Sequence, residues 1–170
     1  MEKKKLIGTY LFDGFDIQGV EMLIRELMVI DKAWYPVYFS DIESNLSSST
    51  NLRVIPDYSA FSVPDLDLMI LPDIKGNTRF LSDSFLLRRL KKHIEKGKKV
   101  IAIAGGIKMI STIIDDRNIA ASGILAMELE FINSNLHIEK GSPIVIDGNI
   151  CTLLDEGKLC DNLVKIIDWI

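Results

Sequence analysis

The stretch KKVIAIAGGIKMIS, residues 98–111, predicts a buried strand that runs through two glycines directly into a helix. Enzymes with α/β folds place nucleophiles on sharp strand-to-helix turns of this kind. The residue at the apex here is Ala104, and its methyl group cannot act as a nucleophile. The stretch therefore indicates the fold class and raises the question of what such a turn does without a reactive side chain.

The rest of the chain alternates between predicted strands and helices. Apolar runs predict strands at 5–12, 34–40 and 65–72, and helical spacing predicts helices over 16–30, 80–96 and 157–170. Residues 136–154 alternate like antiparallel strands, with a tight turn at Asp147-Gly148. Alternating strands and helices favour an α/β fold, a mostly parallel sheet sandwiched by helices with a late β-hairpin. The strands ending at Phe12, Leu71 and Ala104 should be central, because they are the most continuously apolar.

Length and composition restrict the classes of partner. A chain of 170 residues, 48% hydrophobic, predicts a single domain spanning 1–170. A net charge of −4 argues against nucleic acid as a partner. We find no apolar run long enough to cross a membrane and no signal-type segment, so we expect a cytoplasmic protein without a membrane partner. Cys151 and Cys160 have no metal-binding spacing and are expected to be small buried residues, without a disulfide.

Four segments, in this order, resemble the ThiJ/PfpI family of the class I glutamine amidotransferase-like superfamily. They are YLFDGFDIQGVEM (10–22), RVIPDYSAFSVPDLDLMILPD (53–73), KKVIAIAGG (98–106) and PIVIDGNICTLLDEG (143–157). In the family these positions hold an acidic residue beside the reactive thiol, an L-P-G-G turn, an A-I-C-x-G elbow and a D-G-N-x-x-T hairpin. The resemblance implies a flavodoxin-like α/β sandwich and a homodimer. No cofactor and no metal ion are expected.

This chain departs from the family where the chemistry would occur. The family's cysteine is Ala104, and its L-P-G-G turn is Leu71-Pro72-Asp73-Ile74, where a carboxylate would repel a developing oxyanion. Ser122 and Gly123 stand where the family often has a histidine. We predict His93 on the exposed face of its helix and His137 on a strand, both structural or solvated. The family's G-P-G turn is replaced by 155–157.

The resemblance therefore implies no catalytic residues and a vestigial ligand-binding site. For the family's acidic residue, a three-residue shortening after Phe15 leaves Asp16 as first choice and Gln18 as second. The candidate ligand-binding residues are Asp16, Gln18, Asp73, Ala104, Gly105 and Gly106. The two glycines can be read as a tight structural junction, which we favour, or as a pair of free amides that hold a ligand.

Three functions remain open. The first is a non-catalytic protein that acts as a small-molecule-binding, sensing or accessory module, with an unknown small molecule or protein as partner. The second is a hydrolase or glyoxalase-type enzyme with relocated chemistry at Cys160 or Asp16. The third is a phospho-acceptor receiver domain with Asp73 as acceptor. Such a domain needs a hydroxyl residue after the next strand, and this chain has Ala104 there.

Four carboxylates are expected around the vacant elbow at the carboxyl edge of the sheet: Asp16, Asp73, Asp155 and Glu156. Such a cluster raises the local negative potential. A site surrounded by these carboxylates would favour a cationic or polyhydroxylated ligand over an anion. The alternative is that the side chains point into water and form an ordinary acidic surface.

Overall fold

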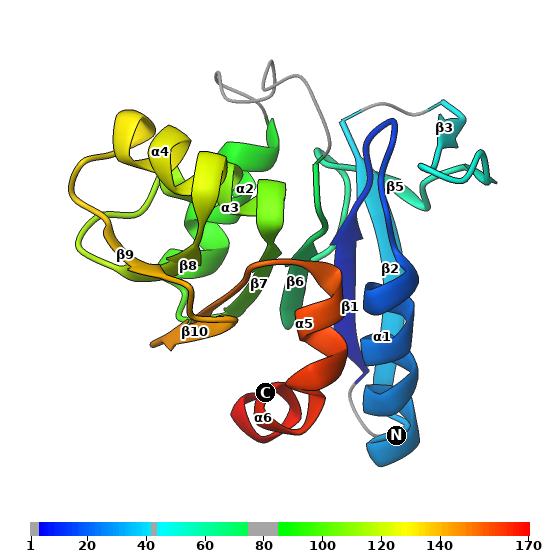
Figure 1. The fold of residues 1–170 in the computed structure, drawn as a ribbon. Coiled ribbons are helices and arrows are strands. Elements are labelled where there is room, and N and C mark those ends of the chain that lie inside the picture. The colour runs from blue at the N-terminus through cyan, green and yellow to red at the C-terminus, as the bar shows by residue number, and fades with distance from the viewer. Residues whose placement is uncertain (1–3, 42–43, 75–84) are drawn as a thin grey trace.

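Three parallel strands form the middle of a seven-stranded sheet in the computed structural model, which describes residues 4–41, 44–74 and 85–170 (Figure 1). The strand order is β10-β11-β7-β6-β1-β2-β5. All neighbouring strands in this sheet pair in parallel except β10 and β11, which are antiparallel. The strands are β1 (Lys5–Tyr10), β2 (Trp34–Ser40), β5 (Tyr58–Ser59), β6 (Leu68–Leu71), β7 (Lys99–Ile103), β10 (Ile144–Asp147) and β11 (Ile150–Leu153). The mostly parallel sheet with β1, β6 and β7 at its centre is confirmed.

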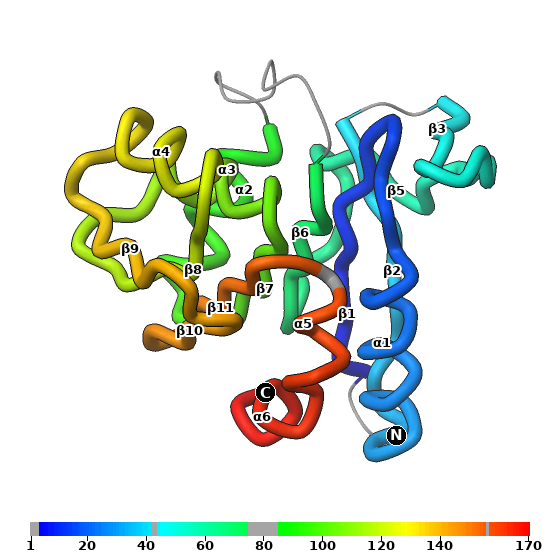
Figure 2. The backbone as a smooth tube through the Cα atoms, viewed as in Figure 1, coloured from blue at the N-terminus to red at the C-terminus, as the bar shows by residue number. Residues whose placement is uncertain are grey.

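Helices cover both faces of this sheet (Figures 1 and 2). One face carries α1 (Gln18–Ile30), α5 (Glu156–Asp161) and α6 (Leu163–Trp169), and the other carries α2 (Phe85–Glu95), α3 (Ile107–Ser111) and α4 (Gly123–Ile132). In β7, Val100 and Ala102 pack toward α2 to α4, whereas Ile101 and Ile103 pack toward α1 and α5. Successive side chains of a strand point to opposite faces, so a strand buried on both faces must be apolar throughout.

One predicted helix needed correction, and the start of another lies outside the described residues. Helix α2 is described from Phe85, and residues 80–84 of the prediction lie outside the described residues. It ends as expected before Gly97, which has a φ of +70°. The predicted helix over 157–170 is instead two helices that break at Asn162. The Asn162 side chain donates to the Lys158 carbonyl at 2.8 Å, and such local bonds compete with helix continuation.

Two smaller sheets flank the main one. β3 (Leu46–Ser47) and β4 (Arg53–Val54) are antiparallel, and β8 (Asn118–Ala121) pairs in parallel with β9 (His137–Lys140). The expectation that 137–140 would join the antiparallel strands was wrong. Helix α4 connects β8 to β9 as a crossover, and such a connection makes the two strands parallel. Sequence alternation indicates a strand but does not identify its partner.

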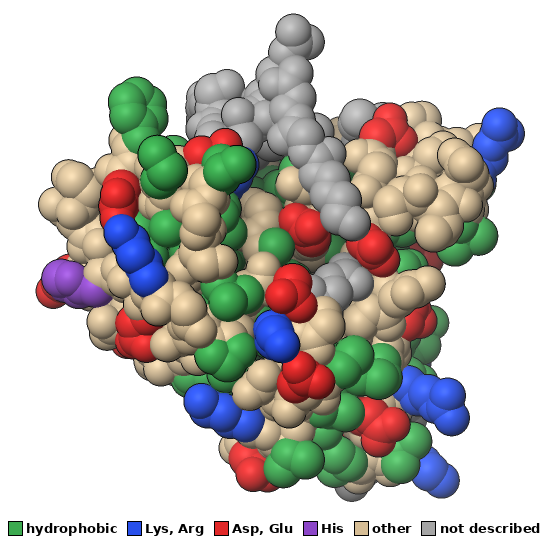
Figure 3. Space-filling model, viewed as in Figure 1, with side chains coloured by type: hydrophobic (Ala, Val, Ile, Leu, Met, Phe, Trp, Pro, Cys, Tyr) green, Lys and Arg blue, Asp and Glu red, His purple; other side chains and the backbone are tan. Residues whose placement is uncertain are grey.

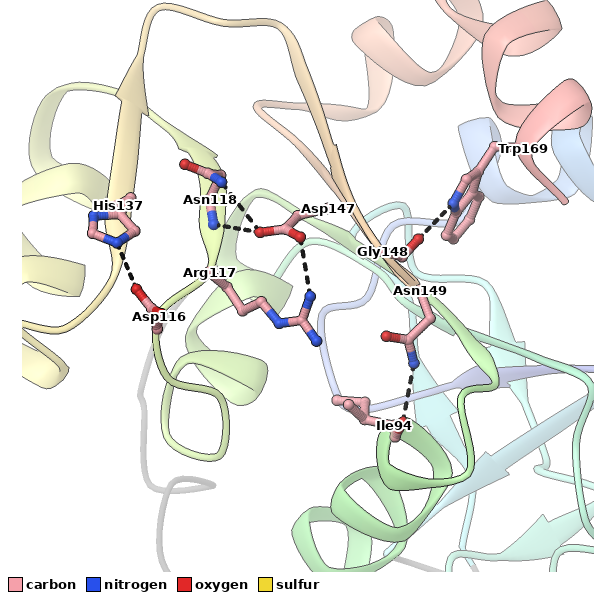
Figure 4. Close-up of polar contacts among 9 residues, drawn as sticks. All are labelled: Ile94, Asp116, Arg117, Asn118, His137, Asp147, Gly148, Asn149 and Trp169. Atoms are coloured by element: carbon pink, nitrogen blue, oxygen red, sulfur yellow. Dashed lines mark hydrogen bonds and ion pairs between the residues drawn. The ribbon is translucent and has the colours of Figure 1, made fainter.

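The β10–β11 hairpin has the predicted turn and is held by polar side chains (Figure 4). The Asp147 carboxylate accepts from the Asn118 main-chain N–H at 2.9 Å and from Arg117 at 3.0 Å. These contacts, the Asn118 N–H above all, lower the pKa of Asp147. The Asn149 side chain donates to the Ile94 and Lys98 carbonyls at 3.1 and 2.8 Å. The family-like D-G-N segment therefore acts here as a structural clamp that joins β8, α2 and β7 to the hairpin.

Further contacts of the same region fix Trp169 and His137 (Figure 4). The Trp169 indole N–H donates to the Gly148 carbonyl at 3.0 Å, which ties α6 to the hairpin turn. The His137 ring lies 2.8 Å from the Asp116 carboxylate on the surface, in agreement with the expected structural or solvated role.

Two side chains lie differently from the sequence prediction. His93 is buried, with 6% exposure, and its Nε2 lies 3.0 Å from the Lys99 carbonyl oxygen; burial lowers its pKa. The expectation of an exposed helix face was wrong because the loop before β6 also packs on this side. Cys151 is buried as predicted, but Cys160 is exposed, and both thiols are free.

One helix face on the surface is strongly apolar. Ile124, Met127 and Phe131 of α4 are 77%, 69% and 93% exposed, and their spacing places them on one side of the helix. We refer to these three residues as the α4 stripe. Within the described ranges, every helix is too short or too polar to cross a bilayer.

Candidate functional site

The predicted elbow is present at the end of β7. Ala104 begins the 3₁₀ turn η2 (Ala104–Gly106), which leads into α3, and its φ is +44°. A left-handed backbone costs a residue with a side chain about 1 to 2 kcal/mol. Residues held in this way persist only where the surrounding structure imposes the conformation. The elbow therefore keeps the geometry of a nucleophile turn although its apex carries only a methyl group.

Close backbone packing explains the two glycines that follow. A Cβ atom on Gly105 would lie 2.4 Å from the Ile74 carbonyl oxygen, and one on Gly106 would lie 2.5 Å from the Leu71 carbonyl oxygen. Real side chains essentially never come so close to the main chain. Both glycines are buried beneath the segment that follows β6. This observation supports the structural junction that we favoured for Gly105-Gly106.

Asp73 makes direct contact with the elbow. Its Oδ1 accepts a hydrogen bond from the Gly105 main-chain N–H at 2.9 Å, between residues 32 positions apart in the chain. An ionised acceptor on an N–H group makes a stronger bond than a neutral one. The carboxylate thus already fills the acceptor position on the amide that follows the apex residue. The amide is engaged by the protein's own negative group.

Asp16 and Gln18 lie at the same edge of the sheet as the elbow, but after β1, with β6 between β1 and β7. The spacing of neighbouring strands places β1 and β7 roughly 10 Å apart. Asp16 is half-buried, and its Oδ1 lies 3.4 Å from the Gln18 main-chain nitrogen at the start of α1. The Gln18 side chain is exposed. Of the six predicted site residues, Asp73 and the elbow residues are thus brought together, while Asp16 and Gln18 form a neighbouring group.

Of the four carboxylates expected around the elbow, Asp73 contacts it and Asp16 lies at the same edge of the sheet. Figure 3 shows acidic side chains on the viewed face around the start of α5, near the middle of the molecule. Asp155 is exposed, and its Oδ1 accepts from the Lys158 N–H at 2.9 Å, so it caps α5. The side chain of Glu156 lies outside the described part of the structure.

The sequence analysis missed one polar pair at the same edge. Tyr10 is fully buried, and its hydroxyl group donates to Asp41 at 3.2 Å. Burial raises the pKa of both groups, and the Asp41 charge raises that of Tyr10 further. The apolar run around Tyr10 indicated a buried strand, but its hydroxyl had no local partner in the sequence that could have revealed the pair.

The alternative thiol site receives little support from its surroundings. Cys160 is the fifth residue of α5, and its sulfur lies 3.8 Å from the Met22 sulfur. The chain's two histidines contact the Lys99 carbonyl and Asp116 instead. In the part of the chain that the structure describes, we find no group of three or more histidine, cysteine and acidic residues placed to hold a metal ion.

Comparison with solved structures identifies the fold, whereas comparison of sequences finds no match. No protein-family model matches the sequence, and no curated protein matches it either. A cysteine-to-alanine mutant of a DJ-1 superfamily protein from Salmonella typhimurium is similar in structure, with 16% identity, a TM-score of 0.78, and coverage of 95% of this chain and 88% of that chain. A proposed transcriptional regulator from Vibrio parahaemolyticus has 14% identity and a TM-score of 0.83, with 97% and 92% coverage. A proposed protease I from Bacteroides thetaiotaomicron has 17% identity and a TM-score of 0.77, with 96% and 98% coverage.

These TM-scores establish a common fold, and identities this low leave activity open. The strand order, the helices on both faces and the late hairpin agree with the arrangement that the sequence resemblance implied. The chain therefore has the flavodoxin-like α/β fold of the DJ-1/ThiJ/PfpI superfamily.

Proposed function

We propose that this protein is a non-catalytic member of its fold class that binds a small molecule at the elbow and acts as a sensing or accessory module. The observation that carries the proposal is the contact of the Asp73 carboxylate with the Gly105 amide, beside an apex that is alanine. A site that stabilises an oxyanion must offer free donors at the position where negative charge develops. Here an internal carboxylate occupies the Gly105 donor, and the apex residue beside it, Ala104, is not a nucleophile.

The same contact supports a ligand class. An anion at the elbow would have to displace Asp73 and would meet its charge, whereas a cationic or polyhydroxylated molecule could bind the free lone pairs of the carboxylate. Asp16, half-buried at the same edge, would reinforce this preference. The names of similar structures do not decide the matter, because they include a proposed regulator and a proposed protease.

Ligand preference can be tested by thermal shift with putrescine, ribitol, acetate and phosphate. A ligand at about 100 times its dissociation constant stabilises by roughly 2.7 kcal/mol, or about 5 to 11 °C for a chain of this size. We expect putrescine or ribitol to raise the Tm of the wild type, and acetate and phosphate to leave it unchanged.

Two substitutions at Asp73 separate charge from geometry. Asp73→Asn keeps an acceptor for the Gly105 amide but removes the charge, so stabilisation by putrescine should fall. Asp73→Ala vacates the amide, so acetate should now stabilise. Asp168→Asn, an equal charge change on the exposed side of α6, is the matched control and should match the wild type. Stabilisation of the wild type by acetate alone, unchanged in Asp73→Ala, would contradict the proposal.

Catalysis by relocated groups is the competing function, and the exposure of Cys160 favours testing it. Selective modification of Cys160 by a thiol reagent does not distinguish an enzyme from a non-catalytic protein, because Cys160 is exposed and Cys151 is buried whichever of the two is correct. Turnover is the better measurement. We expect no amidase, protease or glyoxalase activity in the wild type or in Ala104→Cys. Robust wild-type turnover that Cys160→Ser or Asp16→Asn abolishes would favour the enzyme instead.

The remaining properties are also proposals. We place the protein in the cytoplasm as a homodimer, with the α4 stripe as the apolar surface available for self-association. We infer no nucleic acid and no membrane as its partners.

A further inference from the structure

The outer face of α2 and the turn after it are strongly basic, although the whole chain has a net charge of −4. Between residues 88 and 98 the acidic side chain is Glu95, and the basic ones are Arg88, Arg89, Lys91, Lys92, Lys96 and Lys98. The core side of this helix is buried against the sheet through Leu86, Leu87 and Leu90. The basic side chains therefore lie together on the outer side of α2 and on the turn after it, whereas the elbow lies at the carboxyl end of β7.

A small hollow of about 60 Å³ opens within this surface. Its charged lining consists of Arg89, Lys92, Lys96 and Lys98 together with Asp65, and the buried His93 also lines it. Asp65 pairs with Lys96 at 2.7 Å, and Asp67 pairs with Lys98 at 3.6 Å. Among the described residues, Arg89 and Lys92 therefore supply the excess positive charge of this lining. Because a water molecule occupies about 30 Å³, the hollow has room for a group the size of one carboxylate.

A larger hollow of about 310 Å³ adjoins the small one, and both are lined by Arg89 and Lys92. Phe61 and Phe85 form its apolar part, with exposures of 73% and 54%. Their rings pack edge to face with centroids 5.4 Å apart, and the Arg88 guanidinium lies 5.7 Å from the Phe85 ring centre. We call the two hollows together the α2 groove.

The groove is arranged before any partner arrives. Arg89 donates to the Pro64 carbonyl at 2.9 Å, and the loop that carries Pro64 also carries Phe61. A side chain already held in place loses less conformational freedom on binding. Exposed aromatic rings beside arginine are also the composition that is enriched at protein interfaces.

We propose that the α2 groove binds an acidic segment of a partner protein, with one bulky apolar side chain in the larger hollow against the Phe61 and Phe85 rings and a carboxylate in the small hollow. Charge complementarity carries the choice of occupant. A short acidic peptide meets the local positive field, whereas a long polyanion also meets the negative charge of the rest of the molecule. The apolar hollow supplies a contact that phosphate-backbone recognition does not need. The inference does not depend on the elbow or on the function proposed for it.

Binding can be measured by fluorescence anisotropy with the labelled peptide Asp-Glu-Asp-Phe-Asp-Glu-Asp. Two further probes are the same peptide with alanine in place of phenylalanine and one with lysine in place of every acidic residue. We expect binding of the first peptide only, weakened as salt rises, because exposed charges are screened.

Variants locate the site. Phe61→Ser and Lys92→Glu should each weaken binding by about tenfold or more, as central interface residues do. Lys91→Glu makes the same charge change on the same helix, but Lys91 lines neither hollow. This control should stay within about twofold of the wild type if the groove is specific. Phe61 and Lys92 are exposed, and circular dichroism of each variant verifies the fold.

Four results would overturn the proposal. Equal loss in Lys91→Glu and Lys92→Glu would show non-specific attraction, and unchanged binding in Phe61→Ser would remove the apolar anchor. Tighter binding of single-stranded DNA or of phosphatidylserine vesicles, dependent on Phe61, would assign the groove to another class of partner. A dimer in light scattering that Phe61→Ser or Lys92→Glu dissociates would assign it to a second copy of this chain.

Discussion

Substitution of Gly106 by alanine tests whether packing or helix propensity controls the elbow. Gly106 has helical backbone angles, a φ of −60° and a ψ of −24°, so alanine is conformationally allowed. Helix propensity alone predicts a gain of up to about 1 kcal/mol for glycine to alanine. The structure predicts the opposite sign, because the new Cβ would lie 2.5 Å from the Leu71 carbonyl oxygen and 2.8 Å from that of Pro72.

The expected magnitude follows from what has to move. Both neighbouring atoms belong to the main chain at the end of β6, in the centre of the sheet, and cannot rotate away as a side chain would. Overpacking of this kind costs typically about 1 to 3 kcal/mol. We therefore expect Gly106→Ala to lose about 2 kcal/mol, which corresponds to a fall in Tm of about 4 to 8 °C.

The assay is urea unfolding followed by circular dichroism, with Gly157→Ala as the matched control. A Cβ on Gly157, in α5, would meet only the Asp155 carboxylate oxygen at 3.0 Å, and this side chain can move. Moving this oxygen weakens the Asp155 cap on the Lys158 N–H, which offsets the gain in helix propensity, so the control should stay within about 1 kcal/mol of wild-type stability. A Gly106→Ala protein as stable as the wild type would refute the close packing of the elbow against β6.

Three further predictions concern other parts of the molecule. Burial lowers the pKa of His93 from 6.5, so its contribution to stability should be fully present above that pH and be lost as the pH falls toward the folded-state pKa. His93→Leu should flatten this part of the urea-measured pH profile, and an unchanged profile would contradict the assignment. Asn149→Ala removes the bonds to the Ile94 and Lys98 carbonyls and should cost about 1 to 3 kcal/mol in thermal unfolding, whereas a loss below about 0.5 kcal/mol would show that the clamp is dispensable. Light scattering should give twice the chain mass of 19.1 kDa, and Phe131→Glu in the α4 stripe should restore the single-chain mass; a wild-type monomer would exclude the dimer.

Much of the fold could be predicted because its signals are local. Residues 100–103 of the predicted strand are apolar at every position, so both faces had to be covered, and this required a central strand between two helical layers. The double glycine after it indicated a sharp turn, and the turn at Asp147-Gly148 indicated the hairpin. The parallel pairing of β9 with β8 and the break at Asn162 were missed because they depend on partners rather than on periodicity.

The candidate site was predicted in its residues but not in its contacts. The sequence indicated that Asp73 follows a strand ending at the same sheet edge as the elbow. It carried no sign that the carboxylate accepts from the Gly105 amide, since 32 residues separate the two groups. The burial of His93 and the exposure of Cys160 were likewise decided by neighbouring segments that no local pattern describes.

The sequence by itself determined the residue types at the elbow, with Ala104 at its apex and the carboxylate of Asp73 after the preceding strand, and an alternation of strands and helices that favours a parallel sheet. Only the tertiary structure decided how these groups meet. Residue type and periodicity act over a few positions, whereas the parallel alignment of β6 and β7 brings separate segments to within hydrogen-bond distance. That alignment gives Gly105 and Gly106 their steric role and directs the Asp73 carboxylate onto the Gly105 amide.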